Sequence, residues 1–235
     1  GLFRFGSIAS RLPTPMLINS DFSRRAIVTA QDHRWVASPP PGVERVMLDR
    51  IGSERARATS LVRYQPHSVF PAHGHPGGEE ILVLDGTFSD DSGDYGAGWY
   101  LRNPPGSSHQ PSSTEGALIF VKLWQMPEGE STAVRLDTHD PAAWHREGAH
   151  EVCPLYQSAY EQVSLQRLPS GASVSLDTQG GAEVLVLDGQ LVEGREPFGR
   201  GSWMRLPPGA VCTLTAGADG VTIYLKAGHL AGLIP

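Results

Sequence analysis

Two stretches of this chain share one ten-residue pattern. Residues 77–86 read GGEEILVLDG and residues 180–189 read GGAEVLVLDG, an offset of 103 positions. The same offset maps the Pro-Pro-Gly sequence at 104–106 onto Pro-Pro-Gly at 207–209. A long match without gaps indicates two copies of one fold unit arranged in tandem.

Each copy reads as a series of short strands. The chain of 235 residues contains 27 glycines and 19 prolines, and strong helical periodicity is scarce, which is typical of strands joined by tight turns. In the first copy we expect strands over residues 59–64, 68–72, 80–84, 98–101 and 118–124, with a turn at residues 85–86. These elements predict an all-β fold of two antiparallel barrels of the jelly-roll type.

The repeat also sets the expected domain organisation. We expect an N-terminal arm over residues 1–33, a first barrel over residues 34–140 and a second barrel over residues 141–235. Close to the boundary, Asp140 and Pro141 read as the capped start of a short helix. Two fused copies can imitate a dimer within one chain, so a monomer and a homodimer both remain open.

Charge and composition exclude several function classes. The formal net charge is -6, which argues against a nucleic-acid partner or an anionic membrane surface. The sequence has no stretch of eighteen apolar residues and therefore no expected membrane span. Two cysteines cannot build a disulfide framework, and residues 1–20 lack the apolar core of a secretory signal. We expect a reduced, cytoplasmic protein.

Four residues of the first copy have the spacing of a metal site. His73 and His75 alternate along one strand, so their side chains share a face. The glycines at 77–78 allow a tight turn before Glu79. His109 follows the rigid Asn-Pro-Pro-Gly turn at 103–106 and must come from a separate strand. We therefore expect one divalent metal ion per chain, held by His73, His75, Glu79 and His109.

The second copy lacks all four of these residues. At the equivalent positions it carries Leu176, Thr178, Ala182 and Cys212. Its glycines, prolines and apolar strand are kept, so the loss is specific to the expected ligands. Glu80, by contrast, recurs as Glu183, which favours a structural role for Glu80 and the ligand role for Glu79.

The ligand types restrict which metal ions are plausible but do not identify one ion. Imidazole suits Zn, Cu, Fe and Ni, and one carboxylate keeps Mn and Fe open, while the lack of a thiolate disfavours a soft-metal site. Four protein ligands can complete a tetrahedral zinc ion in a closed structural or sensing site. An ion of higher coordination number would keep open positions for chemistry.

The two motifs resemble the paired signatures of the cupin superfamily. This resemblance implies two double-stranded β-helix barrels and makes the chain a bicupin with a degenerate second copy. Residues 35–126 resemble a narrower group, the cupin of ChrR-type anti-sigma factors. The segments that carry this resemblance are PPGVE (40–44), ATSLVRY (58–64), HGHPGGEE (73–80), GDY (93–95), RNPPGSSH (102–109) and FVKLW (120–124).

The ChrR-type resemblance implies a zinc cupin with a regulatory role. That group restrains an ECF sigma factor and responds to oxidative stress such as singlet oxygen, and its cupin binds zinc. The resemblance assigns the ligand roles to His73, His75, Glu79 and His109. Zinc is therefore the first expectation, with Fe, Mn and Ni as alternatives. A sigma factor or another regulatory protein is the implied partner.

Other readings stay open beside this one. The chain has no HxxxCxxC motif and no helical segment before residue 35, so the resemblance covers the cupin and not the sigma-binding domain. Similar cupins, such as dihydroxyacetophenone-type dioxygenases, hold iron and imply an oxidoreductase acting on a small carbonyl, diketone or aromatic substrate. A cupin that only binds a small molecule is the third reading.

Several further residues are candidates for supporting roles. Strand position alone does not separate inward from outward side chains. Candidates for lining the first cavity are Arg63, Tyr64, Arg102 and Trp124. A second metal site is conceivable at His139, His145 and His150, although a solvated linker is the simpler interpretation. Cys212 reads either as packing or as a redox-active thiol. The simplest reading of Asp90, Asp91 and Asp94 is a solvated turn.

Overall fold

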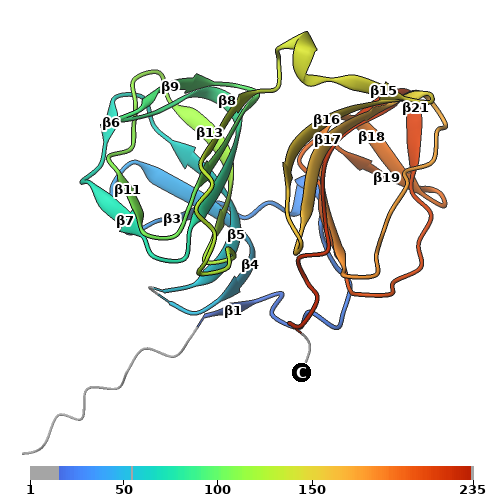
Figure 1. Cartoon of the computed structure of the whole chain (residues 1–235), viewed down its shortest axis with the longest axis horizontal. Coiled ribbons are helices and arrows are strands. Elements are labelled where there is room, and N and C mark those ends of the chain that lie inside the picture. Colours follow the sequence, from blue (N-terminus) through green and yellow to red (C-terminus); the bar gives the residue numbers. More distant parts are fainter. Residues whose placement is uncertain (1–15, 54, 234–235) are drawn as a thin grey trace, which may run out of the picture.

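The computed structural model describes residues 16–53 and 55–233 and shows two β-barrels that lie side by side (Figure 1). The expected all-β fold with two tandem jelly-roll barrels is confirmed. In the described ranges, helical structure is limited to two short 3-10 turns, η1 (Ala30–Asp32) and η2 (Pro141–Ala143). Asp140 caps η2 by accepting a hydrogen bond from the Ala142 backbone, as its sequence predicts. Over the same ranges, no helix has the length and apolar character to cross a membrane.

The first barrel is built on one large sheet. Its strand order is β1-β4-β5-β13-β8-β10-β14. These strands are β1 (Leu17–Ile18), β4 (Val43–Ile51), β5 (Arg57–Tyr64), β13 (Ala117–Leu123), β8 (Glu79–Asp90), β10 (Trp99–Asn103) and β14 (Val134–Asp137). The remaining strands are β3 (Val36–Ala37), β6 (Ser68–Val69), β7 (His73–His75), β9 (Gly93–Gly96), β11 (Ser107–His109) and β12 (Ser112–Ser113). Of these, β7 and β11 pair with each other and carry the three histidines of the predicted site.

The second barrel repeats this arrangement. Its strand order is β15-β16-β17-β21-β18-β20-β2, with β19 beside β18. The strands are β15 (His145–Glu147), β16 (His150–Gln157), β17 (Gln162–Leu168), β18 (Ala182–Glu193), β19 (Glu196–Gly199), β20 (Trp203–Leu206), β21 (Thr215–Ala227) and β2 (Ala26–Val28). In Figure 1 this barrel is coloured yellow to red, apart from β2, which comes from the blue end of the chain.

Each barrel is completed by a strand that precedes the other barrel. β14 lies between the two copies in sequence and pairs with β10 of the first barrel, where Leu136 is opposite Tyr100. β2 lies ahead of the first copy and pairs with β20 of the second barrel, where Val28 is opposite Trp203. Tyr100 and Trp203 are equivalent at the offset of 103, so the repeat extends upstream to these exchanged strands.

The prediction of a turn at residues 85–86 is wrong. β8 continues through it to Asp90, and the register with β13 shifts by one residue between Leu118 and Ile119. Gly86 has a φ of 68°, and a Cβ there would lie 2.0 Å from the carbonyl oxygen of Gly116. The glycine is therefore required for the close approach of two strands at an irregularity in the sheet.

Charged residues cross the interface between the barrels. The main sheets face each other across an apolar core that includes Leu82 and Phe120 from the first barrel and Leu185 from the second. Within it, Glu80 pairs with Lys226 at 2.8 Å, and Glu183 forms the reciprocal ion pair with Lys122. The structural role expected for Glu80 is confirmed, since its carboxylate joins the two barrels.

The barrel interiors differ. The second is filled by apolar side chains, including Val184, Met204 and Leu225. Three of the four residues that replace the expected ligands join this packing: Ala182 is a fully buried member of the apolar cluster, and Leu176 and Cys212 pack against that cluster. The first barrel instead keeps an open cavity beside its histidines.

Candidate metal centre

A paired strand and a tight turn position the four predicted ligands. His73 and His75 lie on β7, and His109 lies opposite His73 on β11. Glu79 opens β8 directly after the glycines at 77–78. A Cβ on Gly77 would lie 2.4 Å from the Trp124 ring, and Gly78 has a φ of 80°, so this turn needs both glycines.

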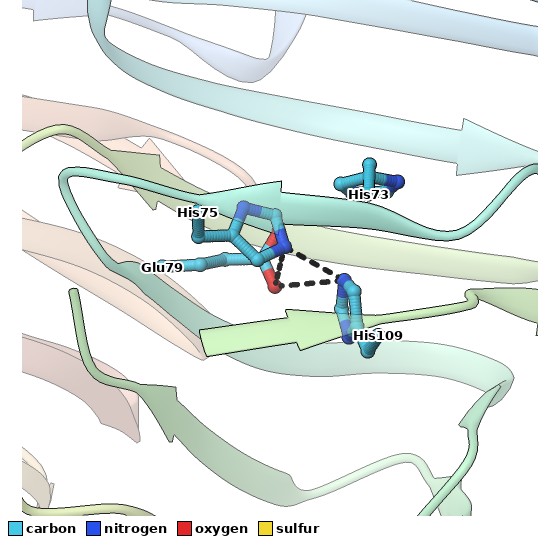
Figure 2. A group of neighbouring side chains, drawn as sticks. All are labelled: His73, His75, Glu79 and His109. Atoms are coloured by element: carbon cyan, nitrogen blue, oxygen red, sulfur yellow. Dashed lines mark hydrogen bonds and ion pairs between the residues drawn. The ribbon is translucent and has the colours of Figure 1, made fainter. Parts of the chain in front are cut away.

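The four side chains converge in space (Figure 2). The Nε2 atoms of His75 and His109 are 2.7 Å apart. The Oε1 atom of Glu79 lies 3.3 Å from the first of these nitrogens and 3.5 Å from the second. His73 is more exposed, and with it all four ligand atoms lie within 4.8 Å of one another.

This arrangement fits a divalent cation. With metal–ligand distances of about 2.0–2.2 Å, neighbouring ligand atoms of one ion lie roughly 2.8–3.6 Å apart, at the low end in octahedral and at the high end in tetrahedral geometry. Small side-chain rotations would bring all four ligand atoms into that range. Three imidazoles and one carboxylate also supply nitrogen and oxygen donors without a thiolate, which suits Zn, Fe, Mn or Ni.

The pKa values of His75 and Glu79 bear on the same interpretation. Burial, followed by the neighbouring rings of His109 and His73, lowers the pKa of His75 to about 3, so its imidazole is neutral. Burial raises the pKa of the Glu79 carboxyl. A bound cation would stabilise this buried carboxylate, and neutral imidazole is the form of histidine that coordinates metals.

Three residues outside the predicted set hold the ligands in place. Asp90 lies 3.2 Å from Nδ1 of His109, on the ring edge opposite the ligand nitrogen. Asn103 donates a hydrogen bond to Glu79 at 3.0 Å, and Arg135 donates to Asn103 at 2.6 Å. Such partners orient metal ligands and fix the histidine tautomer.

The interpretation of Asp90 as part of a solvated turn is wrong. Its side chain is 1% exposed. Burial alone would raise the pKa of this carboxyl, but the hydrogen bonds from His109 and Ser92 lower it to about 2. The carboxylate therefore stays charged beside the ligand histidine. Asp91 and Asp94 are exposed, as a solvated turn predicts.

The internal repeat held a signal for two of these supporting residues. Asn103 maps onto Leu206 at the offset of 103. In the exchanged strands, the sheet register places Ile27 at the position of Arg135. Both polar side chains are therefore replaced by apolar ones in the barrel that lacks Glu79. Comparison of the copies finds Asn103 from sequence alone, whereas Arg135 requires the strand exchange to be known.

The site borders a cavity of about 550 Å³ inside the first barrel. Two of the four cavity candidates, Tyr64 and Trp124, line it together with His73, His75 and Glu79.

The other two candidates lie outside this cavity. Arg63 is on the outer surface, where its guanidinium stacks 4.0 Å from the centre of the Trp35 ring. Arg102 is fully buried between the barrels and pairs with Glu130 and Glu161 at 2.7 and 2.6 Å.

The remaining histidines and cysteines form no second cluster. In the part of the chain that the structure describes, the four predicted ligands are the one group of His, Cys, Asp and Glu side chains spaced to hold a metal ion. His145 instead pairs with Glu147 on the surface. Burial and the charge of Glu193 raise the pKa of the Cys212 thiol, which disfavours the reactive thiolate. Packing is therefore the better account of Cys212.

Residues 23–127 match the protein family described as the ChrR cupin-like domain. This range contains the four ligand residues, Asp90 and Asn103, and ends before Arg135. A search among curated proteins gave no significant match.

Solved structures share the fold of most of the chain. A candidate dioxygenase from Nostoc punctiforme has a TM-score of 0.68 at 15% identity, over 87% of this chain and 82% of the other. A candidate glyoxylate-induced protein from Pseudomonas aeruginosa has a TM-score of 0.66 at 16% identity, over 91% and 90%. Bacterial pirin from Escherichia coli, in complex with nickel(II), has a TM-score of 0.63 at 13% identity, over 87% and 99%. At these identities the likeness shows the fold alone.

Proposed function

Since residues 23–127 match the family described as the ChrR cupin-like domain, we propose that this chain is a metal-dependent sensor. Its first barrel would hold one divalent ion, and its cavity would bind a small molecule beside that ion. The observation that carries the proposal is the position of the ligand set, because three of the four ligands line the cavity of about 550 Å³. A molecule in this cavity would therefore meet the ion directly.

Zinc is the ion we propose first. Three neutral imidazoles and a carboxylate complete a tetrahedral zinc site and leave a net charge near +1 on the ion and its ligands. A change at such a site would reach the second barrel through the strand that bears Glu79, because the next residue, Glu80, pairs with Lys226. The match to the ChrR cupin-like domain motivates a role in stress sensing, with a regulatory protein such as a sigma factor as the proposed partner.

A metal-dependent dioxygenase is the second candidate. The cavity beside the ligands favours it, because an ion of coordination number five or six would keep open positions that face this space. When bound, iron or manganese would supply Lewis-acid and redox chemistry at the edge of the cavity. The chain would contribute Tyr64 and Trp124 as contacts for a small carbonyl, diketone or aromatic substrate. Asp90 would orient His109.

Metal analysis of the purified chain tests both candidates. The full chain is expressed without added metal, and bound ions are counted by mass spectrometry. One zinc ion per chain, with no oxygen uptake when small diketones or aromatics are added, supports the sensor. Oxygen uptake that depends on iron loaded under anaerobic conditions supports the dioxygenase. A wild-type chain that retains no divalent ion contradicts both.

A further inference from the structure

Two arginines line the metal cavity. Arg45 lies on β4, and Arg50 lies near the end of the same strand with 8% of its surface exposed. The Arg50 guanidinium donates hydrogen bonds to the backbone carbonyls of Gly52 and Ser53. The Nε atom of Arg45 is buried and has no hydrogen-bond partner. Among the described residues, neither arginine forms an ion pair with a carboxylate.

The second barrel has lost both charges. The sheet register places Val152 at the position of Arg45 and Gln157 at the position of Arg50. This is the same barrel that lacks the four metal ligands. The arginines are therefore not required to build the fold unit, and they occur only in the barrel whose cavity has the ligands.

The charge balance of the cavity calls for an anion. A divalent ion and two guanidinium groups would face only one carboxylate, Glu79, among the described lining residues. Burial, followed by the charge of Arg45, lowers the pKa of Arg50, so these two groups also repel each other. A planar guanidinium binds a carboxylate through parallel hydrogen bonds, which suits an organic acid.

Aromatic side chains line another part of the cavity. The tilted rings of Tyr64 and Phe70 are in contact at a centroid distance of 5.2 Å, and both residues line the cavity together with Trp124. Trp124 has a φ of 60°, and the equivalent position in the second barrel is Gly228. Left-handed backbone is strained for a residue with a side chain as large as tryptophan. Its presence at the cavity, where glycine suffices in the other copy, points to contact with a ligand.

We propose that Arg45 and Arg50 form a carboxylate-binding subsite in the first barrel, and that the ligand is a small organic acid whose apolar body lies against Trp124. The proposal rests on the proposed function for the use of the cavity, but it does not depend on which ion is bound.

Paired acid and amide probes test the subsite. Phenylacetate and its neutral counterpart phenylacetamide are titrated into the full, metal-loaded chain by calorimetry. We expect the wild type to bind phenylacetate more tightly than phenylacetamide. Arg45→Met should raise the Kd of phenylacetate about 10- to 100-fold and leave the Kd of phenylacetamide unchanged. Arg50→Met should act in the same direction, while Arg63→Met, which changes an arginine outside the cavity, should change neither value.

Equal binding of the two probes by the wild type would overturn the proposal, and so would an acid preference that survives Arg45→Met. Arg45→Lys keeps the positive charge and should retain part of the preference for phenylacetate over phenylacetamide. This variant tests the subsite if Arg45→Met does not fold. Metal content is measured in every sample. A chain with one ion and no acid preference contradicts the subsite alone. A chain that binds no ion but prefers the acid contradicts the proposed function and leaves the subsite standing.

Discussion

The carboxylate of Glu80 in the first barrel accepts a hydrogen bond from the Lys226 ammonium of the second barrel at 2.8 Å. Glu79, the preceding residue, faces the cavity of its own barrel. Successive residues of a strand point to opposite faces, so this one step in sequence separates the metal centre from the barrel interface. Mutations at the two positions should therefore have separable effects.

Glu80→Gln should destabilise the chain and leave its metal content unchanged. The substitution removes the negative charge that pairs with Lys226, which is 2% exposed. Breaking one partner of a buried ion pair costs about 3–5 kcal/mol. Urea unfolding measures the loss, and Glu44→Gln, at the surface pair with Arg63, is the matched control with little expected effect. A Glu80→Gln chain as stable as the wild type would contradict the role assigned to this pair.

His75→Ala should release the metal ion and lower the melting temperature. The site binds metal only in the folded chain, so the loss of a ligand removes binding energy that stabilises the fold. Thr178→Ala changes the equivalent position of the second barrel and should retain the full metal content. Elemental analysis of both purified variants checks the prediction. One tightly held ion in His75→Ala would mean that the ligand assignment is wrong.

Asp90→Ala should weaken metal binding by about 10- to 100-fold, because His109 loses the carboxylate that orients its ring. Competition with a metal-binding dye measures the affinity. Asp94→Ala removes an exposed carboxylate from the paired strand β9 and should have no effect. Equal affinities for the two variants would show that Asp90 does not support the site.

The barrel interface should weaken as the pH falls below 6.5. Burial lowers the pKa of His229, which contacts Glu183, to about 4. In the unfolded chain the same imidazole titrates near pH 6.5. The folded state favours the neutral imidazole, so the unfolding free energy has its full value above pH 6.5 and decreases between pH 6.5 and 4. From pH 8 to 5 the expected loss is about 2 kcal/mol, at 1.4 kcal/mol per pKa unit. His229→Gln should remove this part of the pH dependence, and parallel stability curves for the two chains would contradict it.

Glu183 adds a second contribution at lower pH. Burial would raise the pKa of its carboxyl, but Lys122 and His229 hold it well below its usual range. A carboxyl with a lowered folded pKa stabilises the chain above its unfolded value and loses this contribution as the pH falls. Below pH 4.5, the unfolding free energy of His229→Gln should therefore still decrease.

The sequence was most informative where local chemistry decides the structure. The repeat, the turn before Glu79 and the four converging ligands follow from glycine, proline and strand alternation. The sequence did not predict which side chains of a strand point into the barrel. Arg102 was a cavity candidate, yet it lies opposite Glu80, which faces the second barrel, whereas its neighbour Asn103 lies opposite Glu79 and reaches the site.

The exchanged strands were also beyond sequence reasoning. β2 has three residues, which is too short for a periodic pattern to be recognised. Its equivalence to β14 depends on pairing with a distant strand and not on local sequence. The supporting role of Arg135 on β14 could not be seen without that pairing.

The exchange of β2 and β14 has a consequence for how the two halves could diverge. When two identical subunits associate, every amino-acid change enters both partners, so a binding pocket cannot be lost from only one. A single polypeptide that contains both halves is free of this constraint. Its C-terminal half can lose the metal ligands and fill its interior with aliphatic side chains. It still packs against the N-terminal half, which has kept the ligands. Excising either half would take away an edge strand that completes its neighbour.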